Sequence, residues 1–224
     1  MRDIPAGVVV AKLRRRLWSA HRAVVVARDL RDEPSLPVDG IRVEFVDPDA
    51  FDDLPQLVEQ AAGVEYLYLR PIERARQARA GTLSVARAAD GDLVAFHFVH
   101  ETGDFAALDS VAPGMYPELP ADGVLTEEVY CLPAYRGRGL APALLQATGA
   151  MLLERGKQRA IAYLDTTNIA ALRMFNRAGY RPTGEERVDR YRGGRFDTVF
   201  RDATRPTLAE WEAAVNGSRE QVAG

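Results

Sequence analysis

The chain has 224 residues, which is enough for one domain with extensions or for two small domains. An apolar fraction of 47% supports a hydrophobic core, and a net charge of −3 gives no overall basic field that would point to nucleic acid as a partner. Cys131 is the only cysteine, which excludes an internal disulfide framework and a cysteine-based metal cluster. No apolar run approaches the ~20 residues needed to cross a bilayer, and the N-terminus has no apolar signal-peptide core, so we expect a cytoplasmic location.

Residues 1–39 read as a basic N-terminal extension. Up to Arg31 it carries eight Lys or Arg residues against two acidic residues. Residues 8–18 have the pattern of a short amphipathic helix, and residues 23–27 are rich enough in valine to predict a strand. Two interpretations of the charge stay open: a surface for a membrane or an anionic partner, or a solvated face that leads to a strand docking on the main sheet.

A strand, a helix and a hairpin are predicted next. Residues 41–46 alternate as in a strand, and apolar spacing predicts a helix over 51–58. Residues 83–88 and 93–100 flank an Asp90-Gly91 pair, which is typical of a β-hairpin.

Two histidines lie on the second strand of this hairpin. His97 and His100 are three residues apart, so their side chains point to opposite faces of the strand. We therefore expect no shared metal site and interpret each histidine as a surface or core residue rather than as a catalytic base.

A long connection spans residues 103–123 and contains several prolines. Loops of this length often carry function. Tyr116, Glu118 and Asp122 are candidates for a lid over a site, and a disordered crossover is the alternative that the sequence supports equally.

The clearest chemical signal comes after this connection. Residues 124–132 predict a strand, which Pro133 ends because proline has no backbone N–H and a restricted φ. The basic glycine loop Arg136-Gly137-Arg138-Gly139 then leads directly into a helix that begins at Leu140 and ends near Gly156.

A helix that starts at glycines is suited to bind a phosphate. Its first N–H groups have no partner within the helix, its dipole favours an anion, and glycine allows the ligand to approach the backbone closely. These features predict a pyrophosphate cradle. An ordinary strand-to-helix turn with surface arginines remains the alternative, and the loop matches neither G-x-G-x-x-G nor a P-loop.

Further elements are predicted after residue 156. They are a strand over 160–164, a helix from Asn168 to Gly179, a hairpin of 185–191 and 195–200 around Gly193-Gly194, and a terminal helix over 208–215. Thr207 and Glu210 have the spacing of a capping box, which predicts the start of the terminal helix, and Trp211 is expected on its buried side. Residues 216–224 are expected to be frayed.

Two motifs resemble the GCN5-related N-acetyltransferase (GNAT) superfamily: V-Y-C-L-P-A-Y-R-G-R-G-L-A and N-I-A-A-L-R-M-F-N-R-A-G-Y. The acyl-CoA signature of that superfamily, Arg/Gln-x-x-Gly-x-Gly/Ala, is matched by Arg136, Gly139 and Ala141. The resemblance covers residues 41–202. It implies an α/β (α+β) fold with a mixed, mostly antiparallel twisted sheet flanked by helices, and acyl-CoA held where two central strands splay. We expect an acetyltransferase domain over 40–202, followed by a C-terminal helix and tail over 203–224.

The resemblance also implies a function and a cofactor site. The expected activity is transfer of an acetyl or short acyl group from acetyl-CoA to a primary amine, on a small molecule or on a protein. The residues implied for cofactor binding are Val129, Tyr130, Cys131, Arg136, Gly137, Arg138, Gly139, Leu140, Ala141, Asn168 and Phe175. By analogy with the superfamily, the segment between the first two strands shapes the acceptor site, which makes Tyr66, Tyr68 and Arg70 candidates.

Catalytic roles are less clearly assigned. Glu127 or Glu128 is the candidate base that takes a proton from the amine, and the alternation of a strand points the two in opposite directions. Phe175 stands where many superfamily members carry a tyrosine that protonates the departing thiolate, and a phenylalanine has no proton to give. Tyr130, Tyr163 or Tyr191 is a candidate substitute.

Other readings of the chain stay open. Cys131 is interpreted as a small core residue rather than as a nucleophile.

A catalytically weak sensor or partner-binding module that retains acyl-CoA binding is the main alternative to an enzyme. A nucleotide-binding α/β domain is disfavoured because the loop has no lysine or third glycine at the required place.

Overall fold

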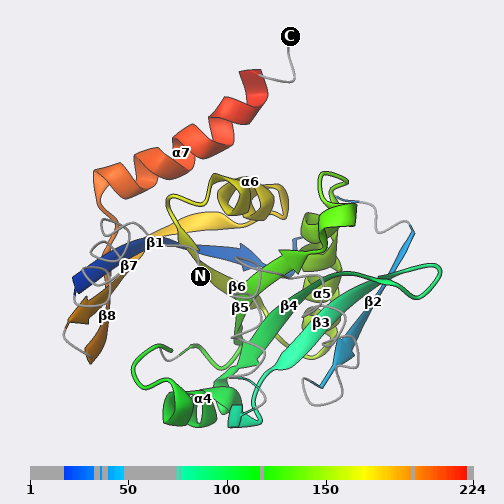
Figure 1. Ribbon diagram of the computed structural model, residues 1–224, viewed down its shortest axis with the longest axis horizontal. Helices are drawn as coiled ribbons and strands as arrows, with labels where there is room; N and C mark the ends of the chain where they lie inside the picture. Colours follow the sequence, from blue (N-terminus) through cyan, green and yellow to red (C-terminus); the bar gives the residue numbers. More distant parts are fainter. Residues whose placement is uncertain are drawn as a thin grey trace, which may run out of the picture. The chain divides into compact units, whose positions relative to one another are not determined.

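The computed structural model describes residues 18–32, 36, 40–47, 75, 77–116, 119–192 and 195–220. The chain divides into two compact units. The larger unit comprises Val26–Ala162 and Arg173–Arg181, and the smaller comprises the described parts of Met1–Val25, Tyr163–Leu172 and Pro182–Gly224. The expected α/β fold, with a mixed and mostly antiparallel sheet flanked by helices, is confirmed (Figure 1).

Four antiparallel strands form most of the sheet in the larger unit. In spatial order they are β2 (Ile41–Val46), β3 (Thr82–Ala88), β4 (Leu93–Glu101) and β5 (Gly123–Cys131), and β5 then pairs in parallel with the start of β6 (Arg159–Asp165). These positions agree with the predicted strands to within one residue. Their alternating or continuous apolar residues supply a buried face, which is why they pair into a sheet.

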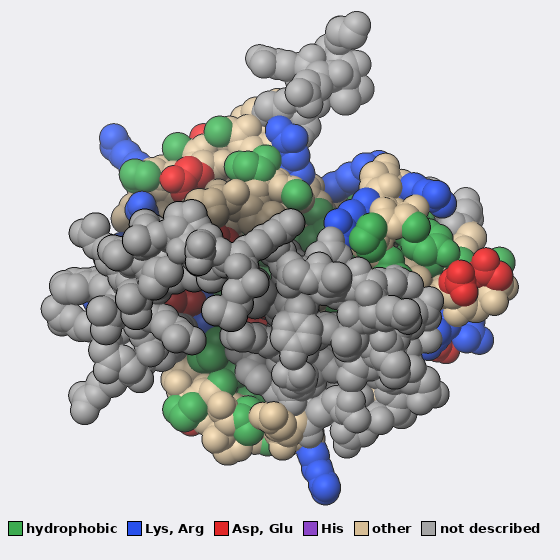
Figure 2. Space-filling model, in the orientation of Figure 1, with side chains coloured by type: hydrophobic (Ala, Val, Ile, Leu, Met, Phe, Trp, Pro, Cys, Tyr) green, Lys and Arg blue, Asp and Glu red, His purple; other side chains and the backbone are tan. Residues whose placement is uncertain are grey.

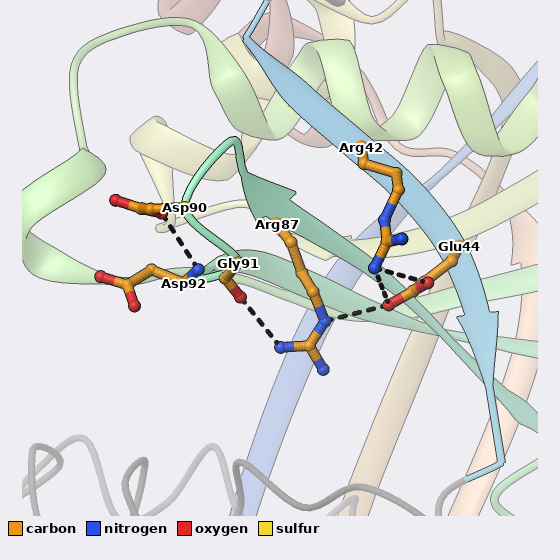
Figure 3. Close-up of polar contacts among 6 residues, drawn as sticks. All are labelled: Arg42, Glu44, Arg87, Asp90, Gly91 and Asp92. Carbon is orange, nitrogen blue, oxygen red and sulfur yellow. Dashed lines mark hydrogen bonds and ion pairs between the residues drawn. The ribbon is translucent and has the colours of Figure 1, made fainter.

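The predicted hairpin between β3 and β4 is confirmed, and Figure 3 shows the polar contacts that hold its turn. Gly91 has a φ of +95°, a conformation that favours glycine. Arg87 donates from Nε to Glu44 on β2 over 2.9 Å and from Nη1 to the carbonyl of Gly91 over 3.3 Å. The backbone N–H of Asp92 donates to the carboxylate of Asp90.

The connection after β4 contains a helix that the sequence analysis missed. A short 3-10 turn over Thr102–Asp104 leads into α4 (Phe105–Val111). The carboxylate of Asp104 accepts a hydrogen bond from the backbone N–H of Glu101 over 2.7 Å, and Leu108 is 1% exposed. The segment is helical because this cap and one buried leucine stabilise it, and because its first proline comes after the helix ends.

Helix α5 (Leu140–Glu154) packs on β2 to β5. Leu144 is fully buried in a cluster with Ala86, Val94 and Ala95. One turn farther along the same helix, the side chain of Thr148 is also buried. Thr148 contacts the hydroxyl of Ser84 at 2.6 Å and Nε2 of His97 at 3.0 Å.

A second core cluster involves the alternate residues of β4. Phe96 and Phe98 point away from the face that carries His97 and pack with Leu83, Val85 and other apolar residues. His97 is thus a core residue, as predicted, and burial lowers its pKa to about 4.

Four elements have residues in both units: β1 (Trp18–Asp29), β6, α6 (Ile169–Arg177) and β7 (Arg181–Arg192), of which only Arg181 belongs to the larger unit. The predicted strand at 23–27 is confirmed and is longer than expected. Trp18, predicted to end an amphipathic helix, instead begins β1, because the valine-rich run that follows extends the strand backwards. The rest of that predicted helix, and the predicted helix over 51–58, lie outside the described residues.

Apart from Arg181, the smaller unit contains the predicted final hairpin, β7 and β8 (Arg195–Asp202), and then helix α7 (Arg205–Glu220). Trp211 is 6% exposed, as expected for the buried side of α7. The capping-box prediction at Thr207 is wrong. The helix begins at Arg205, and Thr207 lies inside its first turn, where its buried hydroxyl donates to Glu186 instead. Helix α7 continues to Glu220, five residues beyond the predicted end at 215.

Among the described helices, none is both long and apolar enough to cross a membrane. Lys and Arg side chains occur at several separate places on the face drawn in Figure 2, together with acidic side chains. This distribution is in keeping with the net charge of −3.

Candidate functional site

Strand β5 contains a bulge at the two candidate bases. Phe96 of β4 lies opposite Tyr130, but Phe98 lies opposite Glu127, so two steps along β4 correspond to three along β5. Glu128 has a φ of +49°, which is uncommon for a residue other than glycine. A bulge of this kind bends the strand and redirects its side chains and backbone groups, and bulges are frequent next to active sites.

Strand β5 also separates from β6 in this region. The parallel ladder within the larger unit consists of three pairs, Gly123↔Arg159, Val124↔Ala160 and Leu125↔Ile161. Strand β5 continues to Cys131 beyond the last of these pairs. In the larger unit the ladder with β6 therefore ends just before the bulge, and the divergence of two central strands stays a prediction.

The glycine loop places the N-terminus of α5 directly after β5. Gly137 and Gly139 both have a φ of +77°, and Gly139 is the N-cap residue of α5 with no side-chain cap. A Cβ atom on Gly137 would meet no heavy atom within 4 Å, so that glycine is required by its backbone conformation rather than by crowding. The first turn of α5 therefore starts without a capping side chain, as an anion-binding helix end requires.

The loop carries two guanidinium groups, and a third lies beside Gly139. Arg136 donates from Nε to the carbonyl of Cys131 over 2.9 Å, and its guanidinium lies 5.4 Å from the ring centre of Tyr130. The guanidinium of Arg138 lies 5.5 Å from the ring centre of Tyr135. The third group belongs to Arg177.

Arg177 was not a candidate in the sequence analysis. It ends α6, and a Cβ atom built on Gly139 would lie 3.6 Å from its Nη2 atom. The sequence signal that could have found it is a basic residue in the last turn of the helix that Gly179 closes. Its position adds positive charge to the predicted phosphate cradle.

The carboxylate of Glu127 faces a histidine. Oε2 of Glu127 lies 3.4 Å from Nε2 of His100 on β4, and the two side chains are 17% and 3% exposed. Glu128 is exposed. This proximity could not be predicted from the sequence, where His100 is a surface or core residue, because it depends on the pairing of β4 with β5.

The ring of Tyr116, a predicted lid residue, lies edge-on to His100 at 5.8 Å between ring centres. Asp122 is exposed, and its carbonyl accepts a hydrogen bond from the backbone N–H of Gln158. The other acceptor-site candidates, Glu118, Tyr66, Tyr68 and Arg70, lie outside the described residues.

The candidate phenols occupy different environments. Tyr130 is 6% exposed and packs on Phe96 at 5.6 Å between ring centres, within the core of the larger unit. Tyr163 lies in the smaller unit, where its ring centre is 5.3 Å from that of Phe200. The side chain of Tyr191 lies outside the described residues.

A further phenol, Tyr180, packs against Phe175 at 4.9 Å between ring centres. Its hydroxyl lies 3.3 Å from that of Thr126 on β5, and burial raises the pKa of Tyr180 to about 12. The sequence analysis noted Tyr180 only as the end of a motif.

The remaining predicted cofactor residues divide between the units. Asn168 belongs to the smaller unit, where its side-chain oxygen caps α6 by accepting the N–H of Ala171 over 3.1 Å. Phe175 belongs to the larger unit and is 3% exposed.

Cys131 is half-buried, and burial raises the pKa of its thiol although Arg136 and Arg138 oppose that effect. A raised pKa disfavours the thiolate that a nucleophile requires, which agrees with the interpretation of Cys131 as a small packing residue.

Comparison with solved structures places this fold among acetyltransferases. The chain is similar to the glucosamine N-acetyltransferase region of a fungal multi-domain β-N-acetylglucosaminidase, with a TM-score of 0.52 and 15% identity over 89% of this chain and 23% of that one. It is also similar to a GNAT acetyltransferase from Colwellia psychrerythraea, with a TM-score of 0.51 and 14% identity over 77% of this chain and 56% of that one. For an N-acetyltransferase from Sphaerobacter thermophilus the TM-score is 0.48, with 19% identity over 85% and 58% of the two chains. The chain thus spans less than two thirds of each of these proteins, and at such identities the likeness concerns the fold alone.

The sequence itself identifies the family. No curated protein sequence matches the chain. A sequence model of the acetyltransferase (GNAT) family matches residues 51–180. Because this match covers more than half of the 224 residues, the chain belongs to the GNAT family of acetyltransferases.

Proposed function

We propose that this protein transfers an acetyl or other short acyl group from coenzyme A to a primary amine. The observation that carries the proposal is the continuous segment from the bulge of β5 through the glycine loop to the first turn of α5. It joins β5, whose ladder with β6 ends at Leu125, to an uncapped helix N-terminus beside Arg177, and Arg136 and Arg138 lie in the loop between them. Membership of the GNAT family supports acyl transfer in general.

The phosphate end of acetyl-CoA would bind at the start of α5. The N–H groups of Leu140 and Ala141 in the first turn would face the pyrophosphate, whereas Pro142 has no N–H to donate. Arg138 and Arg177 would add charge-assisted contacts. The positive φ angles of Gly137 and Gly139 give the loop a shape that fits this role, since they turn the chain so that no Cβ covers the helix end.

The pantetheine arm would lie along β5 where β6 no longer pairs with it. Val129, Tyr130 and Cys131 would supply backbone groups to this arm, and an N–H of the bulge would stabilise the oxyanion that forms during acyl transfer. Of the family-motif residues in the larger unit, Phe175 would pack against the same arm. When bound, coenzyme A supplies the acyl group as a thioester, which is activated for attack by an amine.

Glu127 is the favoured base of the two adjacent glutamates. An amine must lose a proton before it can attack, because a lysine-like ammonium has a pKa of ~10.4. Glu127 is partly buried beside His100, whereas Glu128 is exposed and has a positive φ. A partly buried carboxylate next to the divergence of the strands is better placed to accept that proton from a bound acceptor.

Loss of the usual tyrosine motivates a second candidate function, an acyl-CoA-binding sensor with little turnover. Phe175 is buried against Tyr180 and cannot protonate the thiolate. A thiol with a pKa of ~8.5 leaves without help at a moderate rate, so we retain the enzyme as the first candidate. Retained binding of coenzyme A without turnover over a broad amine panel would favour the sensor.

Calorimetric titration with acetyl-CoA tests the cofactor proposal. Gly139→Glu places an anion at the helix end and should abolish binding. Gly40→Glu is a matched control, because Gly40 has nearly the same φ, +78° against +77°, and open space around it. The control variant should bind as the wild type does. Absence of binding in the wild-type protein, or equal loss in both variants, would contradict the proposal.

A further inference from the structure

His100 and Glu127 form a pair that crosses from β4 to β5 at the bulge. The register places Phe98 opposite Glu127 and His100 opposite Leu125, so the two side chains share one face of the sheet. Nε2 of His100 and Oε2 of Glu127 are 3.4 Å apart, and His100 as a whole is 2% exposed. A histidine buried to this extent has a side chain with a defined position rather than a mobile surface contact.

The ring of His100 is enclosed by its neighbours. Phe98 stacks on it with ring centres 5.8 Å apart and an angle of 7° between planes, and Tyr116 meets it edge-on at 5.8 Å. On a third side the ring lies over Gly81, where a Cβ atom would be 2.4 Å from Nδ1 of His100. Gly81 has a φ of +80°, so both its conformation and its missing side chain make room for the ring.

The two ring nitrogens differ in their surroundings. Nδ1 is buried and has no hydrogen-bond partner among the residues that the structure describes, whereas Nε2 faces the carboxylate of Glu127. A proton on Nδ1 would leave a buried donor without a partner and would turn the lone pair of Nε2 towards the negative carboxylate. This arrangement favours the tautomer that carries the proton on Nε2, which then lies 3.4 Å from Oε2 of Glu127.

We propose that His100 is a positioning residue that holds the carboxylate of Glu127 in place to accept a proton from the acceptor amine. The proposal rests on the proposed function. In the step concerned, the ammonium form of the acceptor gives one proton to Glu127, and the neutral nitrogen then forms a bond to the thioester carbonyl carbon. The C–S bond breaks, the second proton of the nitrogen goes to the thiolate, and Glu127 releases its proton to solvent. The products are the amide, the free thiol of coenzyme A and one proton.

Glu127 needs a partner such as His100 because its own side chain is flexible. A glutamate has several rotatable bonds, and a carboxylate at a bulge is not restrained by a regular ladder. Electrostatic contact with an enclosed ring removes part of that freedom before the acceptor binds. Because misplacement of a catalytic group by about 1 Å can lower a rate by about 100-fold, such a restraint affects turnover more than cofactor binding.

Two substitutions at His100 separate positioning from packing. His100→Gln keeps an N–H near the position of Nε2, and His100→Leu removes it. With acetyl-CoA and an amine found by an acceptor screen, we expect the leucine variant to lower kcat about 10- to 100-fold while its Kd for acetyl-CoA stays within about twofold of the wild type. The glutamine variant should recover most of the loss. A leucine variant with the kcat of the wild type, or a glutamine variant as slow as the leucine variant, would overturn the proposal.

A second pair of variants displaces the ring without changing it. Gly81→Ala inserts a methyl group against Nδ1 of His100, and Gly40→Ala imposes a similar backbone strain where nothing lies within 4 Å. We expect only Gly81→Ala to lower kcat. An equal effect of both substitutions would show that backbone strain rather than the position of His100 is responsible.

Nuclear magnetic resonance tests the pair without any turnover. In the full chain labelled with 15N-histidine, we expect the ring of His100 to show the Nε2–H tautomer and Glu127→Gln to shift its Nε2 resonance. The ring of His97, whose Nε2 contacts Thr148, should not change. An unchanged His100 spectrum would overturn the positioning role even if the enzyme is active. Absence of acetyl-CoA binding in the wild type would instead contradict the proposed function.

Discussion

A buried carboxylate in the smaller unit offers a sharp test of what attaches α7 to its hairpin. Glu186 of β7 is 0% exposed, and its carboxylate accepts bonds from Arg201 at 2.8 Å and from the N–H of Thr204 at 3.2 Å. The hydroxyls of Thr204 and Thr207 donate to it as well. The carboxylate thus joins β7, β8 and the first turn of α7.

We expect Glu186→Gln to lower the free energy of unfolding by about 3 kcal/mol. A glutamine keeps the shape but offers one acceptor oxygen, so about two of these hydrogen bonds are lost, and bonds to a charged group contribute about 1.5–3 kcal/mol each. We take the lower part of that range because Arg201 is 46% exposed and solvent weakens its ion pair.

Urea unfolding followed by tryptophan fluorescence measures the effect, because Trp211 is buried on α7. Glu185→Gln, an exposed neighbour on the same strand, is the control and should change stability by less than about 0.5 kcal/mol. A Glu186→Gln variant as stable as this control would refute the assignment of the carboxylate as the attachment of α7.

The same carboxylate predicts a dependence on pH. Burial by itself raises the pKa of Glu186, but the hydrogen bonds from Thr207, Thr204 and Arg201 outweigh it and lower the pKa to about 2 from 4.5. Because the folded pKa is below the unfolded one, the stabilisation is fully present above pH 4.5 and is lost as the pH falls towards 2. The wild type should therefore lose more stability than Glu186→Gln over this interval. Parallel pH curves for the two proteins would contradict the argument.

Further predictions concern the larger unit. Arg177→Ala should weaken acetyl-CoA binding about 10-fold at low salt and less at high salt, since its charge lies beside the helix end; salt-independent affinity in calorimetry would argue against this role. Thr148→Val should lower the free energy of unfolding by about 2 kcal/mol because it leaves the buried polar atoms of His97 and Ser84 without their partner, and a neutral effect in urea titration would contradict the network. Gly149→Ala should lower the free energy of unfolding by about 1 kcal/mol. A Cβ atom there would lie 3.1 Å from Leu30, and the crowding cost of about 2 kcal/mol exceeds the gain of about 1 kcal/mol from the higher helix propensity of alanine. A variant more stable than the wild type would show that Leu30 moves aside.

Local sequence determined most of the secondary structure and the glycine loop before α5. Asp90-Gly91 forms the predicted hairpin turn, Pro133 follows the end of β5, and Gly139 starts α5 with a positive φ. Each of these features depends on the conformational preference of one or two residues, so a short window of sequence is sufficient to predict it. The family resemblance could also be read from the sequence, because its motif lies in the contiguous stretch from Arg136 to Ala141.

The tertiary structure alone decided which residues meet around that loop. The bulge at Glu128 exists only in relation to the register of β4, and the proximity of His100 to Glu127 follows from the same pairing. Arg177 reaches the start of α5 although 38 positions separate it from Gly139 in the chain. Thr207 of α7 has the sequence spacing of a helix cap, but its hydroxyl donates a hydrogen bond to the buried carboxylate of Glu186 on β7. These contacts join residues that are distant in sequence, and their free energy comes from burial and pairing in the folded chain, which no local preference encodes.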